Sequence, residues 1–146
     1  MKPNFKSDLY QVIEYNSKYL NQIFELWEKT DIGNKARGDN KESIELTIQN
    51  VGKLFLLVDN DLLIGTSWIT TDYRRLYLHH FGILPEYQGK KMSHLLLKHS
   101  LDWAKDTGMQ IKLEVHKENI KALNLYKSYN FKYLGDYDIY IIRSYN

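Results

Sequence analysis

The stretch Phe81–Ser93 reads FGILPEYQGKKMS and indicates more about the fold than any other part of this chain. Its apolar start is typical of a strand end, and Pro85, which cannot donate to a sheet ladder, marks the exit from that strand. A short polar turn follows, and a helical pattern opens at about Met92. A helix N-terminus placed there would suit a phosphate group, because its first amides lack intrahelical acceptors and the helix macrodipole is positive at that end.

A second segment, Glu114–Phe131, repeats the order of strand, turn and helix about thirty residues downstream. It reads EVHKENIKALNLYKSYNF, in which a strand ends at Glu-Val and a helix opens near Asn119. Asn130 stands where the helix would end in a left-handed residue, a conformation that asparagine tolerates. The two segments therefore predict two successive strand–helix units.

Together the two segments resemble the acetyl-coenzyme A signature of the GNAT superfamily of N-acetyltransferases. Gln88 matches the first position of the superfamily's pyrophosphate loop, Gln/Arg-x-x-Gly-x-Gly/Ala. The second segment resembles the pattern Asn-x-x-Ala-x-x-Leu-Tyr…Gly-Phe, with these residues in register: Asn119, Ala122, Leu125, Tyr126 and Phe131. The resemblance is detailed over residues 76–135 and is limited to the order of elements elsewhere.

Two positions of the loop depart from the pattern, since Lys91 and Ser93 replace its glycines. Glycines there let the backbone approach phosphate oxygens without a side chain between them. Lys91 would point outward and add charge, and Ser93 is small and can donate a hydrogen bond. We therefore expect altered or weaker cofactor binding rather than its loss.

The hydrophobic periodicity predicts a sequence of helices and strands along the whole chain. Helices are expected over 18–29, 41–50, 92–105 and 120–129, and strands over 9–14, 53–59, 62–71, 73–84, 111–115 and 137–142. The pattern indicates an α/β or α+β domain with a mixed sheet. The resemblance implies one domain over 1–146, with a mostly antiparallel sheet of six to seven strands and about four flanking helices. It also implies that the sheet splays at its centre and that pantetheine lies in the resulting cleft.

Composition excludes several classes of protein. A length of 146 residues fits one core, and a formal net charge of +2 gives no global case for nucleic acid. The chain has no cysteine, which excludes disulfides and acyl transfer through a thiolate. No apolar run approaches the ~18 to 20 residues of a membrane span, so we expect a cytoplasmic protein without a membrane partner.

Acetyl transfer to an amine needs a base for the amine proton and an acid for the leaving thiolate. The resemblance makes Tyr126 the acid, beside the cofactor sulfur. Three residues are alternative bases: Glu114, whose position resembles that in ribosomal-protein N-terminal acetyltransferases, and His79 and His80, which titrate in the useful range. Each also has a structural interpretation, as a paired surface glutamate or a packed histidine. Strand alternation places the two imidazoles on opposite faces, so no metal site is expected.

The resemblance also assigns the remaining site residues. Acetyl-CoA would contact the strand end, the loop and the second helix through Phe81, Gly82, Ile83, Gln88, Gly89, Lys90, Lys91, Met92, Ser93, Asn119, Ala122 and Tyr126. Backbone amides near Phe81–Ile83 would stabilise the oxyanion. The acceptor would be a small amine or a peptide N-terminus.

The acceptor would meet Trp27, Arg37, Trp68, Asp72 and Tyr73, among which the loop charges also have a plain solvated interpretation. A carboxylate such as Asp39 would pair with a cationic amine, whereas Arg37 or Arg74 would hold an anion. The C-terminal sheet edge would be the contact of a possible homodimer. The alternative function is a CoA-binding sensor or interaction module without catalysis, favoured by Lys91 and Ser93.

Overall fold

The computed structural model describes residues 10–33 and 35–146. The chain forms two compact units, of which the first ends at Glu114 and the second runs from Val115 to Asn146. The first unit contains the sheet and three helices, and the second contains one helix and the C-terminal segment. The expected single domain over 1–146 stays a prediction.

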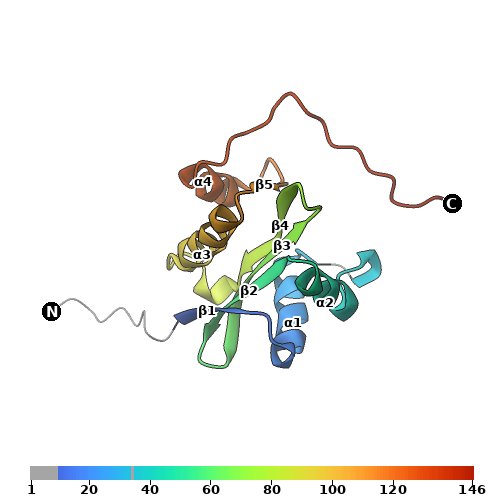
Figure 1. The fold of residues 1–146 in the computed structure, drawn as a ribbon. Coiled ribbons are helices and arrows are strands. Elements are labelled where there is room, and N and C mark those ends of the chain that lie inside the picture. Colours follow the sequence, from blue (N-terminus) through green and yellow to red (C-terminus); the bar gives the residue numbers. More distant parts are fainter. Residues whose placement is uncertain (1–9, 34) are drawn as a thin grey trace. The chain divides into compact units, whose positions relative to one another are not determined.

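Five strands build one sheet in the described part of the chain (Figure 1). They are β1 (Tyr10–Glu14), β2 (Lys53–Asp59), β3 (Leu62–Thr71), β4 (Arg75–Ile83) and β5 (Gln110–Leu113), in spatial order of their numbers. Neighbours are antiparallel except β4 and β5, which run parallel. The predicted mixed, mostly antiparallel sheet is therefore confirmed. The predicted start of β1 at Leu9 lies outside the described residues.

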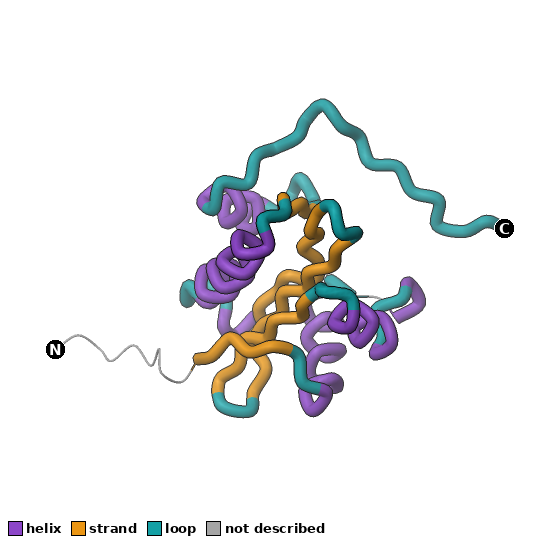
Figure 2. The backbone as a smooth tube through the Cα atoms, viewed as in Figure 1, coloured by secondary structure: helices purple, strands orange, loops and turns teal. Residues whose placement is uncertain are grey.

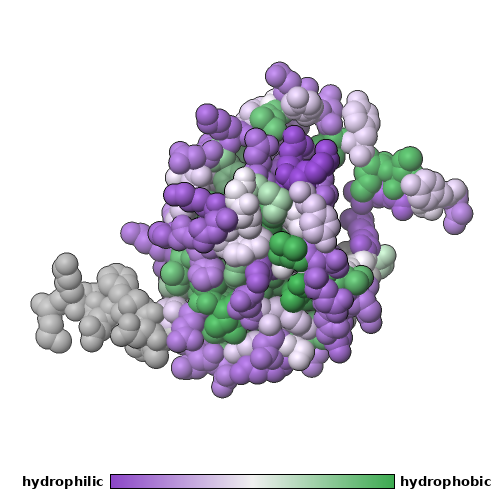
Figure 3. Space-filling view, in the orientation of Figure 1, coloured by the Kyte–Doolittle hydropathy of each residue, from purple (hydrophilic) through white to green (hydrophobic). Residues whose placement is uncertain are grey.

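The expected count of six to seven strands is not confirmed. The segment 137–142, expected to be a closing strand, forms no strand and is drawn as an extended loop (Figure 2). Its apolar side chains are at the surface, Tyr140 with 89% and Ile142 with 70% of their area exposed. Hydrophobic residues follow this extended chain in the space-filling view (Figure 3). A β-prone sequence becomes a strand only where a partner edge supplies its hydrogen bonds, so periodicity alone overestimated the sheet.

Four α-helices accompany the sheet, as expected. They are α1 (Leu20–Thr30), α2 (Lys41–Gln49), α3 (Met92–Thr107) and α4 (Ile120–Ser128), and the short 3₁₀ turns η2 (Ser17–Tyr19), η3 (Lys35–Arg37) and η4 (Pro85–Tyr87) separate them from the strands. Asn40 caps α2 by accepting from the backbone N–H of Ser43, whose hydroxyl accepts from Asn40 in return. Gly108 ends α3 with φ of 75°, the predicted left-handed cap.

Helices cover both faces of the sheet (Figure 1). On one face, the Trp27 indole of α1 donates to Thr66 of β3 over 3.0 Å. On the other, Ser100 of α3 and Ser67 of β3 join their buried hydroxyls over 2.8 Å. The central strand β2 is consequently buried throughout Leu54–Val58, as a strand covered on both sides must be. Within the described ranges, none of the helices is both long and apolar enough to cross a membrane.

Candidate active site

A bulge interrupts β4 at His80. The pairing passes from Thr66↔Gly82 to Trp68↔His79, so two residues of β4 stand opposite the single residue between them on β3. His80 has φ of 45°, in the left-handed region, which costs a side-chain-bearing residue about 1–2 kcal/mol. Bulges and such strained residues concentrate beside functional sites.

The bulge puts both histidines on the face of the sheet that carries α1. His79 Nε2 and Thr70 Oγ1 lie 2.8 Å apart, and the His80 ring lies 5.0 Å from that of Trp68. Trp68 and Thr70 are two residues apart on β3 and so share a face. The expectation that the two imidazoles point to opposite faces is therefore wrong, because strand alternation fails at a bulge. The described residues nevertheless contain no group of three or more side chains able to hold a metal ion.

His80 lies in an aromatic setting. Its ring centroid is 4.5 Å from that of Trp27, and Trp27 and Trp68 stack with centroids 5.4 Å apart. Its Nε2 is 3.0 Å from Asp39 Oδ2, and the two side chains retain only 15% and 17% of their exposed area. Both ring nitrogens are buried and have no aligned hydrogen bond within the described part of the chain, so the contact with Asp39 is an ion pair and not a directed hydrogen bond.

The other two candidate bases also meet here. The register Leu78↔Leu113 places Glu114, the residue after β5, beside His79. Burial lowers the pKa of His79, as does the neighbouring His80, while the carboxylates of Glu114 and Asp39 oppose this shift. His79 keeps some contact with solvent, but partial desolvation of the ring is enough to disfavour its charged form. A neutral imidazole at pH 7 can accept a proton.

The predicted phosphate loop opens α3 as expected. Lys91, which replaces a family glycine, has φ of 63° and thus keeps the left-handed backbone that the glycine would have. No side chain caps the N-terminus of α3. The Gln88 side chain donates to the Ile83 carbonyl over 3.0 Å, and the Lys90 ammonium lies 5.5 Å from the centre of the Tyr87 ring. Gln88 thereby ties the loop to the end of β4.

The second unit holds the other signature residues. Asn119 caps α4 by accepting from the Ala122 N–H over 3.2 Å. Asn130 adopts the predicted left-handed conformation, with φ of 69°. Tyr126 is buried, its ring lies 5.6 Å from that of Phe131, and desolvation raises the pKa of its phenol to about 12. The phenol is therefore protonated at neutral pH and able to donate a hydrogen bond.

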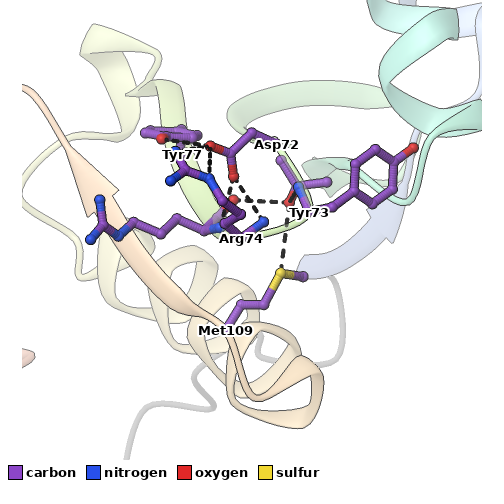
Figure 4. A network of polar contacts seen from close by, with 7 residues as sticks. Asp72, Tyr73, Arg74, Tyr77 and Met109 are labelled. Carbon is purple, nitrogen blue, oxygen red and sulfur yellow. Dashed lines mark hydrogen bonds and ion pairs between the residues drawn. The ribbon is translucent and has the colours of Figure 1, made fainter.

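Two candidate acceptor-binding residues lie away from the histidines, in the turn between β3 and β4 (Figure 4). The Asp72 carboxylate accepts from the backbone amides of Arg74 and Arg75, both over 2.9 Å, and from the Arg74 guanidinium. These amides and then the guanidinium hold the pKa of Asp72 well below its usual range. Tyr73 is exposed, and its hydroxyl donates to Asn50 over 3.2 Å. This network organises the turn.

The other candidates divide between core and surface. Arg37 is exposed in η3, whereas Trp27 and Trp68 are buried core residues whose indoles donate to Thr66 and Thr47. A cavity of about 630 Å³ lies beside α1, with walls that include Phe24, Trp27 and the four carboxylates of Glu25, Glu28, Asp31 and Asp39. Sequence reasoning named Asp39 but missed its contact with His80, since no spacing links a loop residue to a bulge.

Comparison with known proteins agrees with this geometry. A family model described as Acetyltransferase (GNAT) family matches residues 20–131. The N-alpha-acetyltransferase RimI of Mycobacterium tuberculosis is 40% identical over 58 residues, which are 40% of this chain and 35% of that protein. The match thus spans about a third of the length of that curated relative.

Solved structures share the fold at low identity. A GNAT-family acetyltransferase from Staphylococcus aureus Mu50 superposes with a TM-score of 0.75 at 20% identity, covering 88% of this chain and 89% of its own. The ribosomal-protein-S18-alanine N-acetyltransferase from Escherichia coli gives 0.72 at 18%, covering 84% and 77%. Because the family model matches well over half of the chain, the protein belongs to the GNAT acetyltransferase family.

Proposed function

We propose that this protein transfers an acetyl group from acetyl-CoA to a primary amine by direct attack in a ternary complex. The observation that carries the proposal is the turn into α3, where Lys91 keeps a glycine-like backbone at a helix N-terminus without a side-chain cap. Amides of that first turn and the charges of Lys90 and Lys91 suit a pyrophosphate. The loop Gln88–Ser93 is the proposed pyrophosphate site, and Asn119 and Ala122 are proposed to face the pantetheine arm.

The chemistry divides between an acid and a base. Tyr126 is the proposed acid, because a phenol with a pKa raised to about 12 stays protonated and can give its proton to the thiolate of CoA. The base is proposed to come from the group around β4: Glu114, His79 or His80. A lysine-like amine with a pKa near 10.4 is neutral about once in 2,500 at pH 7, which costs about 4.6 kcal/mol, whereas an α-amine costs only about 1 kcal/mol. The base therefore matters most for a strongly basic acceptor.

The acceptor is proposed to be a small amine or a peptide N-terminus. The relatives named for N-alpha and ribosomal-protein alanine acetylation support the second class, and the cavity beside α1 has room for either. A CoA-binding module without catalysis is the second candidate, favoured by the side chains at Lys91 and Ser93. It predicts coenzyme binding without turnover.

The first test combines calorimetry with an acceptor screen. Acetyl-CoA should bind saturably and free adenine nucleotide much more weakly, because only the former fills a pantetheine cleft. Tyr126→Phe keeps the packing but removes the proton donor, so we expect unchanged acetyl-CoA affinity and a loss of about 10²- to 10⁴-fold in kcat, measured as thiol release. Tyr129→Phe, which removes a phenol from the next turn of the chain, is the matched control. Equal turnover in Tyr126→Phe and wild type would exclude Tyr126 as the acid, and binding without any turnover would favour the sensor.

A further inference from the structure

Asp39 belongs to two structures at once. It forms part of the wall of the cavity beside α1, and its Oδ2 lies 3.0 Å from Nε2 of His80. Asp39 is therefore the residue through which a molecule in the cavity would meet the bulge of β4. Both side chains are largely buried, so their charges interact in a setting with little screening by solvent.

The other walls of the cavity define what it could hold. Glu25, Glu28 and Asp31 add three carboxylates, and Phe24 and Trp27 add aromatic surface. The chain as a whole carries a formal net charge of +2, so this concentration of negative charge is local and does not reflect composition. Carboxylates and aromatic faces both attract organic cations, the first by charge and the second through the ring quadrupole.

His80 supplies what an acidic wall alone would lack. A carboxylate binds an ammonium ion but stabilises its charged form, which cannot attack a thioester. An imidazole next to that carboxylate can remove the proton. Because Nε2 faces Asp39, Nδ1 is the ring atom left to accept, directly or through a bound water.

We propose that Asp39 receives the acceptor amine of this acetyltransferase as an ammonium ion at the inner wall of the cavity, and holds His80 in place to take the proton from it. The inference rests on the proposed acetyl transfer and adds to it the class of acceptor, an amine that is cationic in solution, and the choice of His80 as base. The carboxylate can serve both partners because its two oxygens offer about four lone-pair sites.

The steps balance as follows. The ammonium ion on Asp39 loses one proton to His80, and the charge of Asp39 stabilises the imidazolium that results. The neutral amine attacks the carbonyl carbon of the thioester, forming the C–N bond as the C–S bond breaks. The second amine proton is lost on forming the amide, the thiolate is protonated, and His80 returns its proton to solvent. The products are an amide, free CoA and one proton released.

The test compares two amines of similar size, benzylamine as a cation and aniline as a neutral amine at pH 7.5. Asp39→Asn is isosteric and removes the charge, so we expect KM for benzylamine to rise about 10- to 100-fold, as for loss of a hydrogen bond to a charged group. KM for aniline should change less than about twofold, while kcat falls for both amines. Asp31→Asn removes a charge from the same cavity. It should raise KM for benzylamine only slightly and leave kcat unchanged, because Asp31 is not the carboxylate beside His80.

A second readout does not depend on turnover. In protein labelled with ¹⁵N-histidine, benzylamine should shift the imidazole signals of His80, assigned through His80→Asn, and Asp39→Asn should abolish that shift. Thermal unfolding and acetyl-CoA calorimetry show that each variant is folded and loaded. Similar effects of Asp31→Asn and Asp39→Asn, or no shift of His80 in the wild type, would overturn the inference. Wild-type protein that binds acetyl-CoA but acetylates no amine would instead count against the proposed function.

Discussion

At the residue scale, Asp72 makes the turn between β3 and β4 sensitive to pH. Its folded-state pKa is below the ordinary value of 3.8, since two backbone amides and the Arg74 guanidinium stabilise the carboxylate. A depressed pKa stabilises the fold above the unfolded-state value and loses this effect as pH falls toward the folded-state value. The pair with Arg74 is exposed, so the effect is small.

Asp72→Asn should accordingly lower Tm at pH 7 by no more than a few degrees, and the difference from wild type should disappear below about pH 3. The measurement is thermal unfolding by circular dichroism from pH 2.5 to 7. Asp106→Asn, an exposed acidic position on α3, is the control and should show no such convergence. A constant difference across that range would mean that backbone geometry, not charge, is what the substitution changes.

At the element scale, the N-terminus of α3 is strained at one residue. Lys91 adopts a left-handed backbone, which costs about 1–2 kcal/mol, and a glycine would relieve this at an entropic cost of about 0.5–1 kcal/mol. Lys91→Gly should therefore raise stability by up to about 1 kcal/mol, or Tm by about 2–4 °C. Lys90 has no positive φ, so Lys90→Gly should be destabilising.

The two variants remove the same charge from neighbouring positions, which makes them a matched pair for denaturant unfolding and for acetyl-CoA titration. If the backbone governs the approach of phosphate, Lys91→Gly should bind acetyl-CoA more tightly than Lys90→Gly. Equal stability of the two variants would contradict the role assigned to the left-handed conformation.

At the scale of the whole molecule, acetyl-CoA should link binding to folding. A ligand that binds only the folded protein, at 100 times its Kd, stabilises it by about 2.7 kcal/mol, which for a chain of this size corresponds to a rise of about 5–10 °C in Tm. Differential scanning fluorimetry over a range of acetyl-CoA concentrations would measure it. Free adenine nucleotide is the control, and a Tm independent of acetyl-CoA up to millimolar concentrations would contradict coenzyme binding.

The sequence predicted the regular elements well and the departures from regularity poorly. Apolar periodicity located β2, β3 and all four helices, because their buried faces repeat with a fixed period. It could not reveal the bulge at His80, since a bulge changes the phase of the strand without changing its composition. The same limit applies to the segment 137–142, whose alternation was real but whose pairing depends on a partner edge. The signature residues of the loop and of α4 were identified from motif resemblance, and their proposed roles stay predictions.

The candidate site shows the same division. Lys91 was expected to depart from the family loop, but only the structure shows that its backbone stays where a glycine would be. Asp39 was one of several loop charges in the sequence. Its contact with His80 joins residues 41 positions apart, and such a pairing follows from the path of a loop and not from local preference.

The bulge in β4 also bears on how this strand can change during evolution. Before it, His79 faces α1, whereas after it the even-numbered Gly82 does, where an added Cβ would come within 2.7 Å of Ile32. Substitutions in β4 therefore disturb one side chain at a time, but a single deletion within it would restore one uninterrupted alternation and carry a block of side chains into the wrong layer. Relatives with a shorter β4 should be rare, and alignments that place a gap there should be regarded with suspicion.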